Sequence, residues 1–238
     1  MRTLSLCLAI CAALALPQAA LAAQRWPIGD VVLAAFNKGD LSAALAAQRA
    51  ELAKCEATRP AADECLGLLL AASNLARMNG DARLGEVYAR QALDLAQRTL
   101  RAGHPDIATS WNNLAANIQA QGRAAEAEPL YRKALALYEA AFPAGHPDIA
   151  TSWNNLAYNI QAQGRAAEAE PLYRKALALR EAALPAGHPD IATSWNNLAY
   201  NIEERGRAAE AEPLYRKALA LYEAAFPAGH PIIATSWN

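Results

Sequence analysis

The chain has 238 residues, of which 54% are hydrophobic but only 7% are aromatic. Much of the apolar content is alanine, which argues against a deep globular core and favours helices that approach each other closely. The formal net charge of −1 leaves no overall field to attract nucleic acid or an anionic membrane, so we expect no nucleic-acid partner.

Residues 1–22 have the pattern of a secretory signal peptide. A short apolar run follows a basic residue, and an A-x-A cleavage sequence lies at 20–22. The alternative is a transmembrane anchor, but Pro17 and Gln18 leave too few apolar residues to cross a bilayer. We therefore expect export, to a bacterial periplasm, with cleavage after Ala22, and no membrane span in the mature chain.

Two cysteines, Cys55 and Cys65, remain after this cleavage and flank a short segment around Pro60. In an oxidising compartment they predict a structural disulfide that closes a helical hairpin, worth about 2–3 kcal/mol. A redox-active pair is the alternative, but that chemistry prefers a closer C-x-x-C spacing and a neighbouring base.

Residues 23–103 are predicted to form divergent helical repeats that cap the N-terminal end of the protein. A short helix is expected from about Pro27, a longer helix within 37–52, and a helix–turn–helix unit over 66–100 with its turn at 78–81. These segments lack the tryptophan that recurs further along the chain, which is typical of a capping unit with one face in water.

From residue 104 onward the chain repeats a 42-residue unit that opens with HPDIATSWNNLA. The copies span 104–145, 146–187 and 188–229, and an incomplete fourth copy spans 230–238. A fixed period of this size predicts a solenoid, in which each unit buries its apolar face against its neighbours. We interpret the broken fourth copy as the truncated start of a further repeat, which would make the chain a fragment.

Each unit is predicted to form a helix, a turn and a second helix. In the first copy, apolar residues recur every three or four positions over 107–118, which indicates one helical stripe. Gly122 can adopt the left-handed conformation that ends a helix. A second apolar stripe follows over 127–142, until Pro143 breaks the pattern.

Small and large residues alternate within these stripes, and alanines stand where helix backbones must approach within about 8–10 Å. The pattern resembles the tetratricopeptide repeat, and the matching positions of the first copy are Trp111, Leu114, Ala115, Ile118, Ala127, Tyr131 and Ala134. The 42-residue period, with NNLA, GR..EAEPLY..AL and HPD, is similar to the kinesin-light-chain class of these repeats. The resemblance implies an all-α solenoid of stacked antiparallel helix pairs in a right-handed superhelix.

The resemblance also implies that the first helix of each pair lines a concave groove that binds an extended or helical peptide. The residues we expect to contact a partner are Asn112, Asn113, Asn154, Asn155, Tyr158, Gln161, Asn196, Asn197, Tyr200, Glu203 and Glu204. Asparagine amides can donate to and accept from a peptide backbone, and tyrosine is enriched in binding hot spots. Two alternatives stay open. The asparagines could instead link adjacent repeats. The change of QAQ to EER at 203–205 indicates either an acidic patch for a basic partner or drift on a solvated surface.

We expect no catalytic site, no metal site and no cofactor. The four histidines lie one repeat apart, a separation of roughly 20 Å that no shared metal ion can bridge. Ser110 lies inside a helix, without the sharp elbow or oxyanion donors that a nucleophilic serine needs.

The predicted function is therefore a non-catalytic scaffold that binds a peptide or a partner protein. One alternative is the repeat arm of a larger enzyme or signalling protein whose catalytic domain lies beyond Asn238. Another is self-association through an uncapped C-terminal end.

Overall fold

The computed structural model describes residues 30–58, 62–227 and 233. These residues form ten α-helices and contain no strand, which confirms the all-α prediction. The expected signal peptide and nearly all of the incomplete fourth repeat lie outside the described residues. Contacts divide the described chain into an N-terminal unit ending at Ala141 and a C-terminal unit starting at Phe142.

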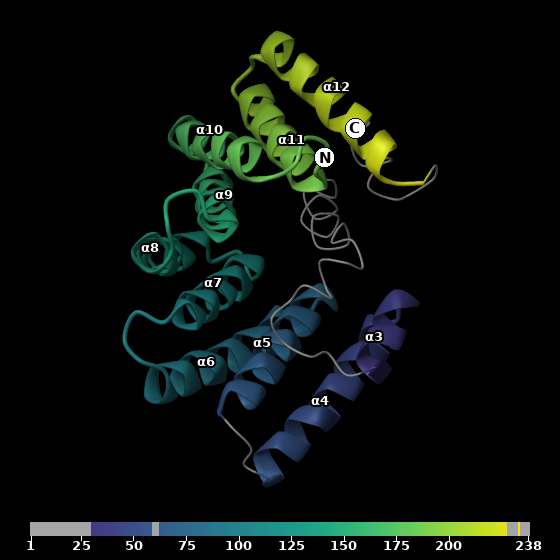
Figure 1. The fold of residues 1–238 in the computed structure, drawn as a ribbon, viewed down its shortest axis with the longest axis vertical. Helices are drawn as coiled ribbons and strands as arrows, with labels where there is room; N and C mark the ends of the chain where they lie inside the picture. The colour runs from purple at the N-terminus through teal and green to yellow at the C-terminus, as the bar shows by residue number, and fades with distance from the viewer. Residues whose placement is uncertain (1–29, 59–61, 228–232, 234–238) are drawn as a thin grey trace. The chain divides into compact units, whose positions relative to one another are not determined.

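The N-terminal unit is a stack of consecutive helices (Figure 1). Its helices are α3 (Asp30–Asn37), α4 (Leu41–Thr58), α5 (Ala62–Met78), α6 (Ala82–Thr99), α7 (Pro105–Ala120) and α8 (Ala124–Ala141). Each helix packs against the next one in the chain, and the pairs α5–α6 and α7–α8 are the most extensive. Cys55 of α4 and Cys65 of α5 form a disulfide, with their Cα atoms 5.8 Å apart.

The C-terminal unit contains two helical hairpins, each from one 42-residue copy. Its helices are α9 (Pro147–Ala162), α10 (Ala166–Ala183), α11 (Pro189–Glu204) and α12 (Ala208–Ala225). Within each hairpin the two helices pack closely, and α10 packs against α11 to join the hairpins. The predicted helix–turn–helix arrangement of these copies is confirmed.

The histidines of the repeated HPD sequence cap the N-terminus of the first helix of each copy. In α11, the His188 imidazole accepts a hydrogen bond from the backbone N–H of Asp190 over 3.2 Å, and Pro189 is the first helical residue. Proline suits that position because its missing N–H would have no partner there, and the Asp190 carboxylate faces the positive end of the helix dipole. Gly206, with φ of +76°, makes the left-handed turn that leads into α12.

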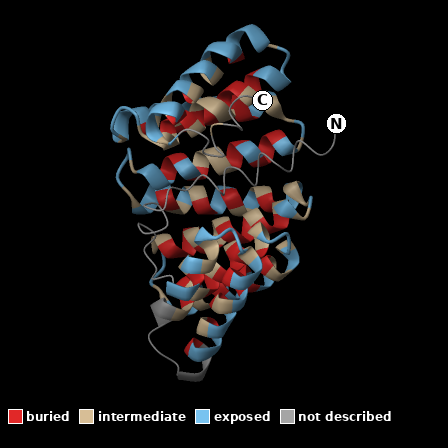
Figure 2. Ribbon diagram, turned by 90° about the vertical axis from the view of Figure 1, so that its right-hand side faces the viewer, coloured by how far each residue is buried: buried red, intermediate tan, exposed pale blue. Residues whose placement is uncertain are grey.

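Alanines occupy the contact lines between helices, as the alternation of small and large residues predicts. In the C-terminal unit Ala157, Ala169 and Ala176 are fully buried, and Tyr173 fills the space beside them. Figure 2 shows the buried positions as stripes along the helices, with exposed positions on the opposite sides. Close approach at these small residues therefore holds each hairpin together.

Candidate partner-binding site

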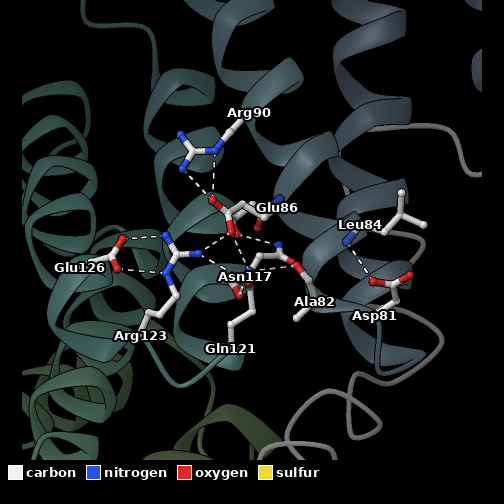
Figure 3. A network of polar contacts seen from close by, with 10 residues as sticks. Asp81, Ala82, Leu84, Glu86, Arg90, Asn117, Gln121, Arg123 and Glu126 are labelled. Atoms are coloured by element: carbon white, nitrogen blue, oxygen red, sulfur yellow. Dashed lines mark hydrogen bonds and ion pairs between the residues drawn. The ribbon is translucent and has the colours of Figure 1, made fainter.

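Charged side chains of the recurring GR..E sequence connect one repeat to the next (Figure 3). In the N-terminal unit Glu86 of α6 accepts hydrogen bonds from Arg90 (2.6 Å), Gln121 (2.6 Å) and Arg123 (2.8 Å). Arg123 also pairs with Glu126 in its own repeat over 2.6 Å. Burial raises the pKa of Glu86, but the hydrogen bonds from its three donors outweigh this and hold the pKa below its ordinary value.

The C-terminal unit repeats this network two copies further along. Glu170 of α10 pairs with Arg174 of its own helix over 2.7 Å, and with Arg205 and Arg207 of the following repeat. Arg207 also pairs with Glu210 over 2.5 Å. These residues of the GR..E sequence thus connect neighbouring repeats.

A third asparagine of each repeat, which the sequence analysis did not single out, lies in the same interface. Asn117 is fully buried and donates to the Ser73 hydroxyl over 2.8 Å. A Cβ atom at position 85 would lie 1.9 Å from the side-chain oxygen of Asn117, so Gly85 must be a glycine. Asn201 is also fully buried and donates to the Gln161 side chain over 3.1 Å.

The predicted asparagine ladder makes contacts between repeats in the C-terminal unit. The Asn197 amide donates to the Asn154 side-chain oxygen over 2.9 Å, which links α11 to α9. In the N-terminal unit Asn113 is only 8% exposed. The interpretation that these amides hold the repeats together therefore has direct support for Asn154 and Asn197, while binding by the asparagines stays a prediction.

The remaining predicted contact residues of the C-terminal unit lie on one side of α9 and α11. Tyr158, Tyr200 and Glu204 follow the asparagines at helical spacings of about four residues, so they share a helix face with them. We call the surface formed by Asn154, Tyr158, Asn196, Tyr200, Glu203 and Glu204 the α9/α11 face. The Tyr158 side chain is 39% exposed, whereas Gln161 is buried beneath the face and donates to Glu204 over 2.5 Å.

The two carboxylates at the end of α11 have neutral hydrogen-bond partners. The Tyr215 hydroxyl of α12 donates to Glu203 over 2.7 Å, and the Gln161 amide donates to Glu204. Burial raises the pKa of Tyr215 far above its ordinary value, and the neighbouring Glu203 carboxylate raises it further. Within the described residues, no lysine or arginine forms an ion pair with Glu203 or Glu204.

Residues 30–58, 62–227 and 233 contain no group of three or more His, Cys, Asp or Glu side chains that could hold a metal ion. Ser110 lies inside α7, as expected, and its hydroxyl donates to the Asp106 carbonyl over 2.9 Å. None of the described helices combines the length and the hydropathy that crossing a bilayer requires.

The fold defines an α-solenoid protein built from stacked helical hairpins. The tetratricopeptide repeat family model matches residues 63–142 and 148–237, which is more than half of the chain. The chain therefore belongs to the tetratricopeptide repeat family. No curated protein sequence matches the chain at a significant level.

Solved structures show the same fold at low sequence identity. A kinesin light chain of Podosopora anserina with nearly identical TPR-like repeats is 22% identical, with a TM-score of 0.67 over 82% of this chain and 93% of that chain. BtubC (BKLC) from P. vanneervenii is 20% identical, with a TM-score of 0.67 over 82% of this chain and 80% of that chain. PlcR of Bacillus thuringiensis, solved with the peptide PapR7 and DNA, is 16% identical, with a TM-score of 0.68 over 87% and 71%. These likenesses show that the chain shares the fold of these proteins.

Proposed function

We propose that this protein is a non-catalytic scaffold that binds a peptide or a partner protein on the α9/α11 face. The tetratricopeptide repeat fold supports a role in protein–protein interaction. Among the structural neighbours, the PlcR structure contains the peptide PapR7, so a fold of this kind accommodates a peptide in that protein.

The observation that carries the proposal is the exposed aromatic surface on the first helix of a repeat. Tyr158 is one of three large hydrophobic side chains that are exposed among the described residues, the others being Val31 and Val87. In the preceding copy the same position holds Ala116. A tyrosine offers a large contact area at a small cost in side-chain entropy, which suits recognition of another polypeptide.

A random dodecapeptide library displayed on phage, selected against the full chain, tests this proposal. We expect wild-type protein to enrich a family of peptides, and the variant Tyr158→Ser with Tyr200→Ser to lose that enrichment. Val87→Ser, which removes an exposed apolar side chain from α6, is the matched control and should select the same peptides as wild type. Equal enrichment by the double variant would reject the α9/α11 face as the binding surface.

We further propose that the protein acts after export, in a bacterial periplasm. The apolar N-terminal sequence with its A-x-A site supports this, and so does the Cys55–Cys65 disulfide, since such bonds persist in oxidising compartments. Mass spectrometry of protein from a periplasmic extract should give a chain that starts at Ala23. An uncleaved chain retained in the cytoplasm would contradict export.

A further inference from the structure

We propose that the α9/α11 face binds a lysine or arginine side chain of the partner peptide at a cluster of tyrosines and carboxylates. This inference rests on the proposed function and specifies the chemistry of the partner. We call the site the tyrosine–carboxylate cluster, and its members are Tyr158, Tyr173, Tyr200, Glu203, Glu204 and Tyr215. The members come from all four helices of the C-terminal unit.

The first argument is the charge of Glu203 and Glu204. Both end α11, where the negative pole of the helix dipole makes a carboxylate unfavourable and a cation favourable. Their side-chain partners are the Tyr215 hydroxyl and the Gln161 amide, which are neutral and bring no positive charge to the two carboxylates. A bound cation would supply the missing charge.

The second argument is the contrast with other glutamates of the same unit. Glu170, Glu210 and Glu212 each pair with an arginine, at nitrogen–oxygen distances of 2.7, 2.5 and 2.6 Å. Arg205, which follows directly after Glu204 in the chain, instead pairs with Glu170. Glu170 thus connects neighbouring repeats, and Glu210 and Glu212 pair within their own repeat, whereas Glu203 and Glu204 have no such cation within the described residues.

The third argument is the position of the Tyr173 hydroxyl group. Tyr173 of α10 is only 2% exposed, and its hydroxyl makes no hydrogen bond to any residue in the described part of the chain. Burial raises the pKa of Tyr173 well above its ordinary value, and Tyr158, Glu204 and Tyr200 lie close enough to raise it further. The Tyr173 hydroxyl thus lies near the Glu204 carboxylate and the two tyrosines, where it can accept a hydrogen bond from an N–H donor of a ligand.

The aromatic members favour an organic cation over a metal ion. Calcium and similar ions require six or more oxygen ligands, whereas tyrosine rings attract lysine and arginine side chains through their negative faces. The protein already contains this contact, because Lys175 lies 5.7 Å from the centre of the Trp153 ring and Lys217 lies 5.7 Å from that of Trp195. Carboxylates beside tyrosines would thus bind a basic side chain and repel an acidic one.

The peptide library described above tests the inference, with the variant Glu203→Gln, Glu204→Ala as comparison. This variant restores the residues of the preceding copy, Gln161 and Ala162, so its helicity and melting temperature should match wild type. Wild-type protein should select peptides at least twofold enriched in lysine and arginine over the unselected library, and the variant should lose that enrichment. A selected basic peptide should bind the variant at least tenfold more weakly, and added salt should reduce the difference.

Other outcomes separate the two proposals. Selection of neutral or acidic peptides by wild type, or an unchanged preference in the variant, would overturn the inference and leave peptide binding intact. Failure of any peptide to enrich would overturn both. If the variant Glu203→Gln, Glu204→Ala folds poorly, Glu204→Gln alone replaces it, because glutamine keeps an acceptor for Gln161. This single variant must bind the selected basic peptide more weakly than wild type for the inference to survive.

Discussion

Arg180 of α10 donates a hydrogen bond to the hydroxyl of Ser194 on α11 over 2.8 Å, from a position where the neighbouring copies carry tyrosine. In the third copy Tyr222 shares a hydrogen bond of 2.9 Å with Thr193, whereas Arg180 reaches Thr151 over 3.2 Å. Only 6% of Arg180 is exposed, so a guanidinium replaces a phenol inside the stack.

Replacing Arg180 with tyrosine is expected to leave the protein equally stable or to stabilise it by about 1–4 kcal/mol. Burial lowers the pKa of Arg180, which means that the fold disfavours its charge relative to water. Arg180→Ala should instead destabilise by about 2–4 kcal/mol, because it leaves a cavity and removes the hydrogen-bond donor for Ser194 and Thr151. Urea unfolding measures both changes. A loss of stability in Arg180→Tyr would show that the charge itself is favourable.

Glu86→Gln should reduce stability at pH 7 by about 1 kcal/mol, since the carboxylate accepts from three donors, two of them arginines. The pKa of Glu86 lies below its ordinary value of 4.5, so its contribution is complete above that pH and is lost as the pH falls through the lowered pKa. The difference between wild type and variant should therefore shrink in acid.

Glu212→Gln is the matched control, because Glu212 holds the same repeat position but, among the described residues, pairs only with Arg216 at the surface. It should change the free energy of unfolding, measured with urea, by no more than about 0.5 kcal/mol at every pH. Equal effects of the two substitutions would show that the contacts between repeats add nothing to stability.

Ala176→Leu should destabilise the C-terminal unit by about 1–3 kcal/mol, because Ala176 is fully buried where helices meet and extra methyl groups force the backbones apart. Ala178→Leu, two residues along the same helix on an exposed position, should change stability by less than about 0.5 kcal/mol. Thermal unfolding of both variants gives the comparison. A tolerated leucine at 176 would contradict close packing there.

Removing the disulfide with Cys55→Ser and Cys65→Ser should lower stability by about 2–3 kcal/mol, because the bond restricts the unfolded chain. Wild-type protein treated with a reducing agent should show the same loss, and the double variant should not respond to reduction. An unchanged midpoint in both would mean that the α4–α5 hairpin is stable without the bond.

The sequence predicted the helical hairpins well because their signals are local. Trp111, Leu114 and Ala134 have the spacing of two packed helices, and HPD with the following glycine turn marks where helices begin and end. Neither signal depends on how one repeat sits on the next. The i,i+4 pair of Glu128 and Arg132, with its 2.6 Å contact, was predictable for the same reason.

Contacts between repeats were not predictable in the same way. Asn197 donates to Asn154 across 43 positions, and Arg207 reaches Glu170 across 37, so both depend on the stacking angle of the hairpins. Near-identity of the copies removes a further clue, since every residue recurs whether it packs, connects repeats or binds a partner. For that reason the asparagines could not be divided between structure and binding from the sequence alone.

The central claim, that a peptide binds on the α9/α11 face, is tested most directly by nuclear magnetic resonance with a peptide selected from the library. Titration into isotope-labelled full chain should shift the amide signals of Tyr158 and Tyr200 most strongly, and leave those of α12 residues far from Tyr215 almost unchanged. Largest shifts on the outer surfaces of α10 and α12, with Tyr158 and Tyr200 unaffected, would contradict the account.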